Sequence, residues 1–204
     1  MPPDITGTRL RVVPHAAGVY LLQLESDDGL NRLSLELLRR VGECREVFPG
    51  ARRFVLTGND SSFSVGADLN AISRLDAATA WDLARQGQHW LNRIATSPIP
   101  YVAAIGGYCL GGGLDLALAC RARLCAEGVY LGHHGAKLGL VTGWGGTQRL
   151  PRLIGSARSL EHLLAAKGWS AELALQQGLV EAVVPRTRLL AASFALSPIA
   201  NISE

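Results

Sequence analysis

Hydrophobic residues along this chain occur in two patterns, short continuous runs and stripes at helical spacing. The runs predict strands at residues 9–13, 19–24, 53–57, 101–105, 122–126 and 180–184. The stripes predict helices at residues 35–48, 76–94, 114–120, 157–167 and 171–177. Ser34 is the expected cap of the first helix, and Ser156 and Gly168 are the expected caps of the fourth. Because strands and helices alternate, the chain is predicted to be an α/β protein.

The composition is that of a folded domain. The chain has 204 residues, of which 48% are hydrophobic and 18% charged, and a single domain typically has about 150 residues. Intrinsic disorder needs the opposite balance, low hydrophobicity with high net charge, so it is excluded. The net charge of +3 comes from scattered basic residues. We therefore expect neither a nucleic-acid partner nor a membrane partner.

Cysteine usage and the first residues bear on the compartment. Residues 1–7 lack the apolar core of a secretory leader, and no apolar run reaches the ~18 residues of a membrane span. No pair of the cysteines has the C-x-x-C spacing of a zinc or redox site, so we expect no metal. The sequence therefore predicts a cytoplasmic protein with reduced thiols. The cysteines are Cys44, Cys109, Cys120 and Cys125.

A glycine-rich turn is the first candidate for chemistry. The run Gly111-Gly112-Gly113 stands between the strand at 101–105 and the helix at 114–120. The first N–H groups of a helix lack internal partners, and the helix dipole adds positive partial charge there. Such a turn can hold an oxyanion, although a tight strand-to-helix turn without function has the same form. It is neither a phosphate-binding P-loop nor a dinucleotide fingerprint.

Three segments in this order resemble the enoyl-CoA hydratase/isomerase family, the crotonases. They are residues 63–69 (FSVGADL), 107–117 (GYCLGGGLDLA) and 143–150 (GWGGTQRL). The resemblance implies a spiral of repeated ββα units that assembles as a homotrimer or as a homohexamer, a dimer of trimers. It also implies an acyl-CoA substrate and no cofactor besides the coenzyme A of that substrate.

The same resemblance assigns binding residues. The thioester carbonyl would lie between the backbone N–H groups of Ala67 and Gly112, with Gly111 beside them. The segment from Ala67 through Asp68, Leu69 and Asn70 is similar to the stretch that contacts coenzyme A in the family. Leu30 stands in a segment similar to the one that lies along the pantetheine arm.

At the family's acid–base positions this chain departs from the pattern. Hydratases of the family use two glutamates, which here are Asp115 and Gly135. Asp115 keeps a carboxylate on a shorter side chain, whereas Gly135 has none. His133 and His134 stand beside Gly135, and either histidine could supply the missing acid or base, since histidine titrates near neutral pH. Both could equally form only local contacts.

The sequence therefore leaves several functions open. We expect a hydratase-like lyase, and a decarboxylase is an alternative because decarboxylation gives an enolate without a base. The pattern around Gly135 and Lys137 is also similar to the dihydroxynaphthoyl-CoA synthase branch, although residues 140–144 do not match that branch. A non-catalytic acyl-CoA binder is the alternative of another class. We expect residues 1–185 to form the core and residues 186–204 to be a short tail in place of the family's C-terminal helical region.

Overall fold

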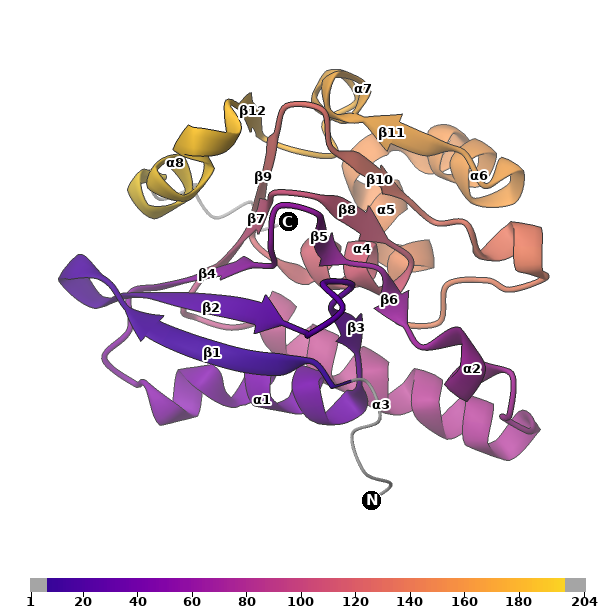
Figure 1. Ribbon diagram of the computed structural model, residues 1–204. Helices are drawn as coiled ribbons and strands as arrows, with labels where there is room; N and C mark the ends of the chain where they lie inside the picture. Colours follow the sequence, from indigo (N-terminus) through magenta and orange to yellow (C-terminus); the bar gives the residue numbers. More distant parts are fainter. Residues whose placement is uncertain (1–6, 197–204) are drawn as a thin grey trace.

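The structure is a computed structural model that describes residues 7–196, and its largest element is a six-stranded sheet (Figure 1). The strand order is β1-β2-β4-β7-β9-β12, in which β1 and β2 are antiparallel and the rest are parallel. The bounds are β1 Arg9–Pro14, β2 Val19–Glu25, β4 Arg53–Thr57, β7 Tyr101–Ile105, β9 Ala122–Ala126 and β12 Ala182–Val184. The parallel strands β7 and β9 are buried along their whole length, which explains why they read as continuous apolar runs.

Short strands form a second sheet, in the order β11-β10-β8-β5, and a separate pair, β3-β6. Their bounds are β3 Arg32–Leu33, β5 Ser62–Ser64, β6 Gly66–Ala67, β8 Tyr108–Leu110, β10 Tyr130–Gly132 and β11 Gly168–Ser170. A strand of the large sheet is repeatedly followed by a strand of the small one, as in β4 then β5, β7 then β8, and β9 then β10. This alternation, with a helix closing the turns, is the spiral of repeated ββα units that the sequence predicts.

Helices cover the sheets and connect them. They are α1 Leu35–Val47, α2 Leu69–Ile72, α3 Ala77–Ala95, α4 Gly112–Ala119, α5 Gly146–Ile154, α6 Ser156–Ala165, α7 Ala171–Gln176 and α8 Leu189–Ala195. Single 3-10 turns are η1 Ala16–Gly18, η2 Gly135–Leu138 and η3 Arg186–Arg188. In Figure 1, α1 and α3 run side by side below β1 and β2. In the described part of the chain, no helix is both long and apolar enough to span a membrane.

The end of the described chain packs against the large sheet. Helix α8 contacts β4, β7 and β9, and the Arg53 side chain donates to the backbone carbonyl of Phe194 at 2.7 Å. Within the predicted tail, residues 186–196 are therefore packed on the core. The other predicted tail residues, 197–204, lie outside the described residues.

Several predicted boundaries need correction. The helix predicted at 114–120 begins at Gly112, so two of the glycines form its first turn. Ser156 is the first residue of α6 and Gly155 is its cap, while Gly168 belongs to β11. Helix α5 was not predicted, because its sequence begins with glycine and contains Pro151, two residues that disfavour helices. The expected Ser34 cap is confirmed, since its hydroxyl accepts from the Leu37 N–H.

Candidate functional site

The turn into α4 presents an unpaired backbone donor. Gly111 has φ +52°, a conformation that favours glycine, and its N–H donates to the Gly132 carbonyl at 2.9 Å, which fixes the turn against β10. The next N–H, that of Gly112, is the first of α4. Among the described residues it has no acceptor, as is usual for the first N–H groups of a helix. The turn therefore offers one donor at the positive end of α4.

The loop that carries Ala67 lies directly against this donor. Strand β6 is held by parallel pairing with β3. Gly66 has φ +88°, and a Cβ on it would lie only 2.7 Å from the Gly112 nitrogen. A Cβ on Gly112 would in turn lie 3.6 Å from the Ala67 nitrogen. The fold thus brings together the two backbone nitrogens that the family resemblance pairs in an oxyanion hole.

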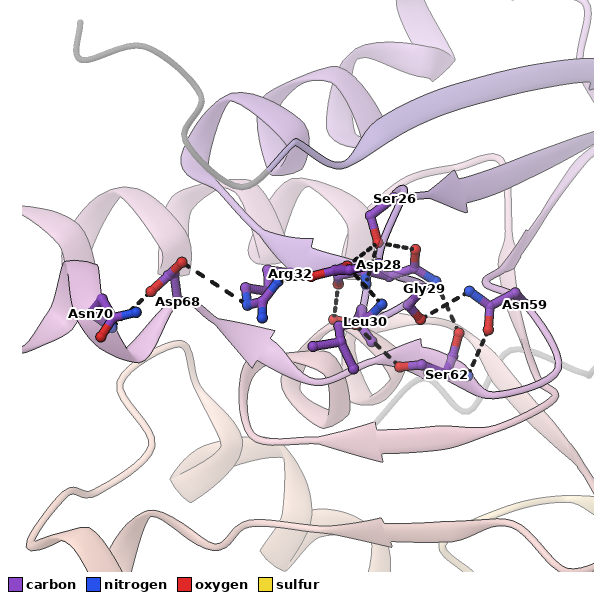
Figure 2. A network of polar contacts seen from close by, with 11 residues as sticks. Ser26, Asp28, Gly29, Leu30, Arg32, Asn59, Ser62, Asp68 and Asn70 are labelled. Atoms are coloured by element: carbon purple, nitrogen blue, oxygen red, sulfur yellow. Dashed lines mark hydrogen bonds and ion pairs between the residues drawn. The ribbon is translucent and has the colours of Figure 1, made fainter.

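A network of polar contacts connects the Leu30 loop to β5 (Figure 2). The Asn59 amide donates to the Gly29 carbonyl at 3.0 Å, and the Ser62 hydroxyl donates to the Leu30 carbonyl at 3.2 Å. Asn31 is fully buried with φ +52°, and its amide donates to the Ser62 carbonyl at 2.9 Å. The network fixes the backbone of the loop while the Leu30 side chain remains 37% exposed.

Beside this loop lie the other residues predicted to contact coenzyme A. Asp68 caps α2, since its carboxylate accepts the Asn70 N–H at 2.7 Å and the Ala71 N–H at 3.2 Å. Arg32 approaches the same carboxylate at 4.0 Å (Figure 2). Leu69 and Asn70 are exposed. Asp68 therefore shapes the segment through capping, and Leu69 and Asn70 offer the open surface.

Asp115, one turn into α4, lies in a buried polar cluster. Its Oδ1 is 3.3 Å from His133 Nε2, and the Thr142 hydroxyl donates to Oδ2. The exposed fraction is 1% for Asp115 and 4% for His133. A Cβ at Gly146 would overlap Asp115 Oδ1, so the cluster requires glycine at the start of α5. The structure thus unites one predicted catalytic carboxylate with one of the two candidate histidines.

Burial favours the neutral forms of both partners. It raises the pKa of Asp115, although His133 and the Thr142 hydroxyl partly oppose that shift. Burial also lowers the pKa of His133, against the pull of Asp115. Asp115 Oδ1 and His133 Nε2 have no hydrogen-bond partner among the described residues. The two atoms therefore face each other in the interior, 3.3 Å apart, with burial favouring the neutral carboxyl and the neutral imidazole.

The other two candidate positions are arranged differently. The His134 ring nitrogen Nδ1 lies 3.0 Å from the Ala166 carbonyl, and the ring stacks on Tyr130 with centroids 5.6 Å apart. These contacts are with Ala166 and Tyr130, whereas the histidine in contact with Asp115 is His133. A Cβ at Gly135 would lie 2.9 Å from the Leu140 carbonyl oxygen. A glutamate at position 135 would therefore require the backbone at Leu140 to move.

The loop before α5 contains residues whose roles the sequence did not reveal. Thr142 binds the Asp115 carboxylate, and the Arg149 guanidinium donates to the Trp144 carbonyl at 2.9 Å. Trp144 is buried, and its Nε1 donates to the Leu83 carbonyl at 3.2 Å. The glycines of the 143–150 segment pointed to this loop. The contacts of this loop with α3 and α4 join residues far apart in the chain, so they leave no pattern in the local sequence.

Comparison with known proteins agrees with this geometry. A family model described as enoyl-CoA hydratase/isomerase matches residues 15–200. An enoyl-CoA hydratase from Bacillus anthracis is 33% identical with a TM-score of 0.84, and the match covers 91% of this chain and 73% of that one. DspI from Pseudomonas aeruginosa is 32% identical with a TM-score of 0.85, and the match covers 92% of this chain and 78% of that one. The chain belongs to the enoyl-CoA hydratase/isomerase family, the crotonases.

The buried carboxyl of Asp115 makes the stability of the folded protein depend on pH, which can be tested. Above the raised pKa of Asp115, folding moves a charged carboxylate from water into the interior. This charge therefore lowers the free energy of unfolding. Asp115→Asn removes the charge, and we expect it to be more stable than the wild type at neutral pH. The gain should shrink as the pH falls through the raised pKa toward the ordinary value of 3.8.

Urea unfolding across a pH series measures this difference. The lowered pKa of His133 means that the unfolded chain takes up a proton more readily as the pH falls below 6.5, which destabilises both proteins. The effect is larger in the variant, which lacks the Asp115 charge that opposes this lowering, so it shrinks the gain at low pH further. The wild-type and variant curves are therefore compared with each other at each pH. Asp82→Asn, on the exposed side of α3, is the matched control and should change little. A less stable Asp115→Asn at neutral pH would contradict the expectation.

Proposed function

We propose that this protein processes acyl-CoA thioesters, with the thioester oxygen bound by the backbone N–H groups of Ala67 and Gly112. The observation that carries the proposal is the close approach of these two backbone segments at the start of α4. Two donors aimed at one oxygen stabilise an enolate more than the neutral thioester, which is the requirement for catalysis. The class of reaction is therefore one that passes through a thioester enolate.

The coenzyme A part of the substrate is assigned to the surface beside this hole. Leu30, Leu69 and Asn70 are exposed there, on backbone that the Ser62 and Asp68 contacts hold in place. A preorganised surface reduces the entropy lost on binding. No cofactor besides the coenzyme A of the substrate enters the proposal.

The reaction we propose is a hydratase-like lyase reaction served by one acid–base pair. Asp115 and His133 would accept a proton from water as its oxygen adds to the β-carbon of an enoyl thioester. The carbon–carbon π electrons then move to form the enolate at Ala67 and Gly112. The pair returns the proton to the α-carbon, which restores the thioester. The lowered pKa of His133 and the raised pKa of Asp115 support a pair that exchanges its proton easily.

Decarboxylation is the second candidate. Asp115 and His133 are both almost fully buried and face each other, and the Leu140 carbonyl leaves little room for a side chain at position 135. A malonyl-type thioester loses carbon dioxide by breaking the bond to the α-carbon, and the electron pair flows into the enolate. That step requires the two backbone donors and no base, so the burial of the pair favours it.

A screen of thioesters with detection of products by mass distinguishes these activities. We expect the wild type to convert an enoyl-CoA such as crotonyl-CoA at less than the ordinary enzyme rate of about 10 s⁻¹. Asp115→Asn should abolish hydration and leave decarboxylation of a malonyl-type thioester unchanged, with Asp82→Asn as the control. Binding without conversion of enoyl-, hydroxyacyl- or malonyl-type thioesters would contradict both reactions and would identify a non-catalytic acyl-CoA binder.

The donor at Gly112 is tested by a pair of substitutions. A Cβ there would lie 2.6 Å from the Trp144 ring, so Gly112→Ala carries the steric effect while keeping the N–H. Gly112→Pro adds the loss of the N–H, and proline is well accepted in the first turn of a helix. We expect the proline variant to turn over about 100- to 1000-fold more slowly than the alanine variant. Equal rates would rule out this donor.

Assembly and compartment complete the proposal. We infer a homo-oligomer, a trimer or a hexamer, supported by exposed leucines on neighbouring α5 and α6, namely Leu153, Leu160 and Leu164. Light scattering should give a multiple of the 21.7 kDa chain mass, and a monomer at micromolar concentration would contradict the inference.

The four cysteines are free and buried, which supports the predicted cytoplasmic location.

A further inference from the structure

Trp144 occupies the space on one side of the proposed oxyanion hole. Its indole is buried, with 5% of the residue exposed. Its Nε1 donates to the Leu83 carbonyl of α3, and Arg149 holds its backbone carbonyl from α5. The ring is thus anchored at both the backbone and the indole nitrogen.

Two glycines on different helices make room for this ring. A Cβ at Gly87, inside α3, would overlap the indole atoms Cδ1 and Nε1. A Cβ at Gly112 would lie 2.6 Å from Cζ3 and 2.8 Å from Cε3 of the same ring. Glycine inside a helix is unfavourable, so the packing of the indole accounts for its presence at position 87. The ring therefore fills the gap between α3 and the first turn of α4.

The position of the hole sets the direction in which an acyl group must run. The Gly112 nitrogen would bind the carbonyl oxygen, and the surface at Leu30 and Leu69 would hold the coenzyme A arm. The acyl group then leaves the carbonyl carbon on the other side, toward Asp115, where the acid–base chemistry takes place. The ring edge lies against Gly112, 2.6 Å from where a Cβ on that residue would stand, and so beside the start of that path.

We propose that Trp144 is the specificity-determining residue of the site, and that its indole limits the substrate to thioesters with a short acyl group. This inference rests on the proposed acyl-CoA function. A butyryl or crotonyl group has few atoms to place beside the ring, whereas an octanoyl group is long enough that it must displace it. The ring is held by a hydrogen bond and by two close-fitting glycines, so displacing it costs binding energy.

Binding of non-reacting thioesters tests the inference without relying on turnover. Calorimetry with butyryl-CoA, octanoyl-CoA and free coenzyme A is applied to the wild type and to Trp144→Ala. We expect the wild type to bind butyryl-CoA more tightly than octanoyl-CoA. In the variant, the ratio of the two affinities should shift at least tenfold toward octanoyl-CoA, because even one methylene group is worth about tenfold in affinity in a hydrophobic pocket. Trp144→Leu provides a milder opening if the alanine variant folds poorly.

Trp90→Ala is the matched control. Trp90 lies on the same helix as Gly87 but packs on Gly42 of α1, where a Cβ would lie 3.1 Å from its ring. It should leave the affinity ratio unchanged. If the wild type binds both thioesters and the Trp144 variants keep the wild-type ratio, the inference is wrong and the proposed function stands. If the wild type binds neither thioester, the proposed function fails, and the inference fails with it.

Discussion

The close approach of backbone segments around the Gly112 nitrogen is the constraint on which the site depends. Gly66 brings β6 to within contact of this nitrogen, and Gly112 leaves room for the Trp144 ring. A side chain at either position would push apart elements that come from distant parts of the chain. Because the first N–H of α4 has no internal partner, the same packing leaves it available as a donor beside Ala67.

Around the proposed oxyanion hole the protein combines a backbone segment held by polar contacts with a buried carboxyl and imidazole. The polar network from Asn59 to Asp68 holds the surface (Figure 2). Burial raises the pKa of Asp115 and lowers the pKa of His133, so holding both groups in the interior costs the folded state stability. Functional groups held against their preferred ionisation commonly trade stability for activity in this way.

The loop from Thr142 to Gly146 connects these parts. Thr142 binds the carboxylate of Asp115, Gly146 leaves it room, and Trp144 reaches across to α3. A family with one fold can change its reaction by changing a few such loop residues. Leu140, just before this loop, packs against Gly135, and the Asp115 carboxyl lies 3.3 Å from the His133 imidazole.

The sequence by itself determined the α/β class and most strands and helices, because these follow from local apolar patterns. The two halves of the proposed oxyanion hole came from the resemblance of its glycine motifs to the family. The sequence named Asp115 and offered His133 and His134 as equals, since adjacent residues have the same local signal. Only the tertiary structure separated them: His133 turns inward to Asp115, and His134 turns to the Ala166 carbonyl. The place of Trp144 between Gly87 and Gly112 was likewise decided by packing between distant elements, which no local pattern records.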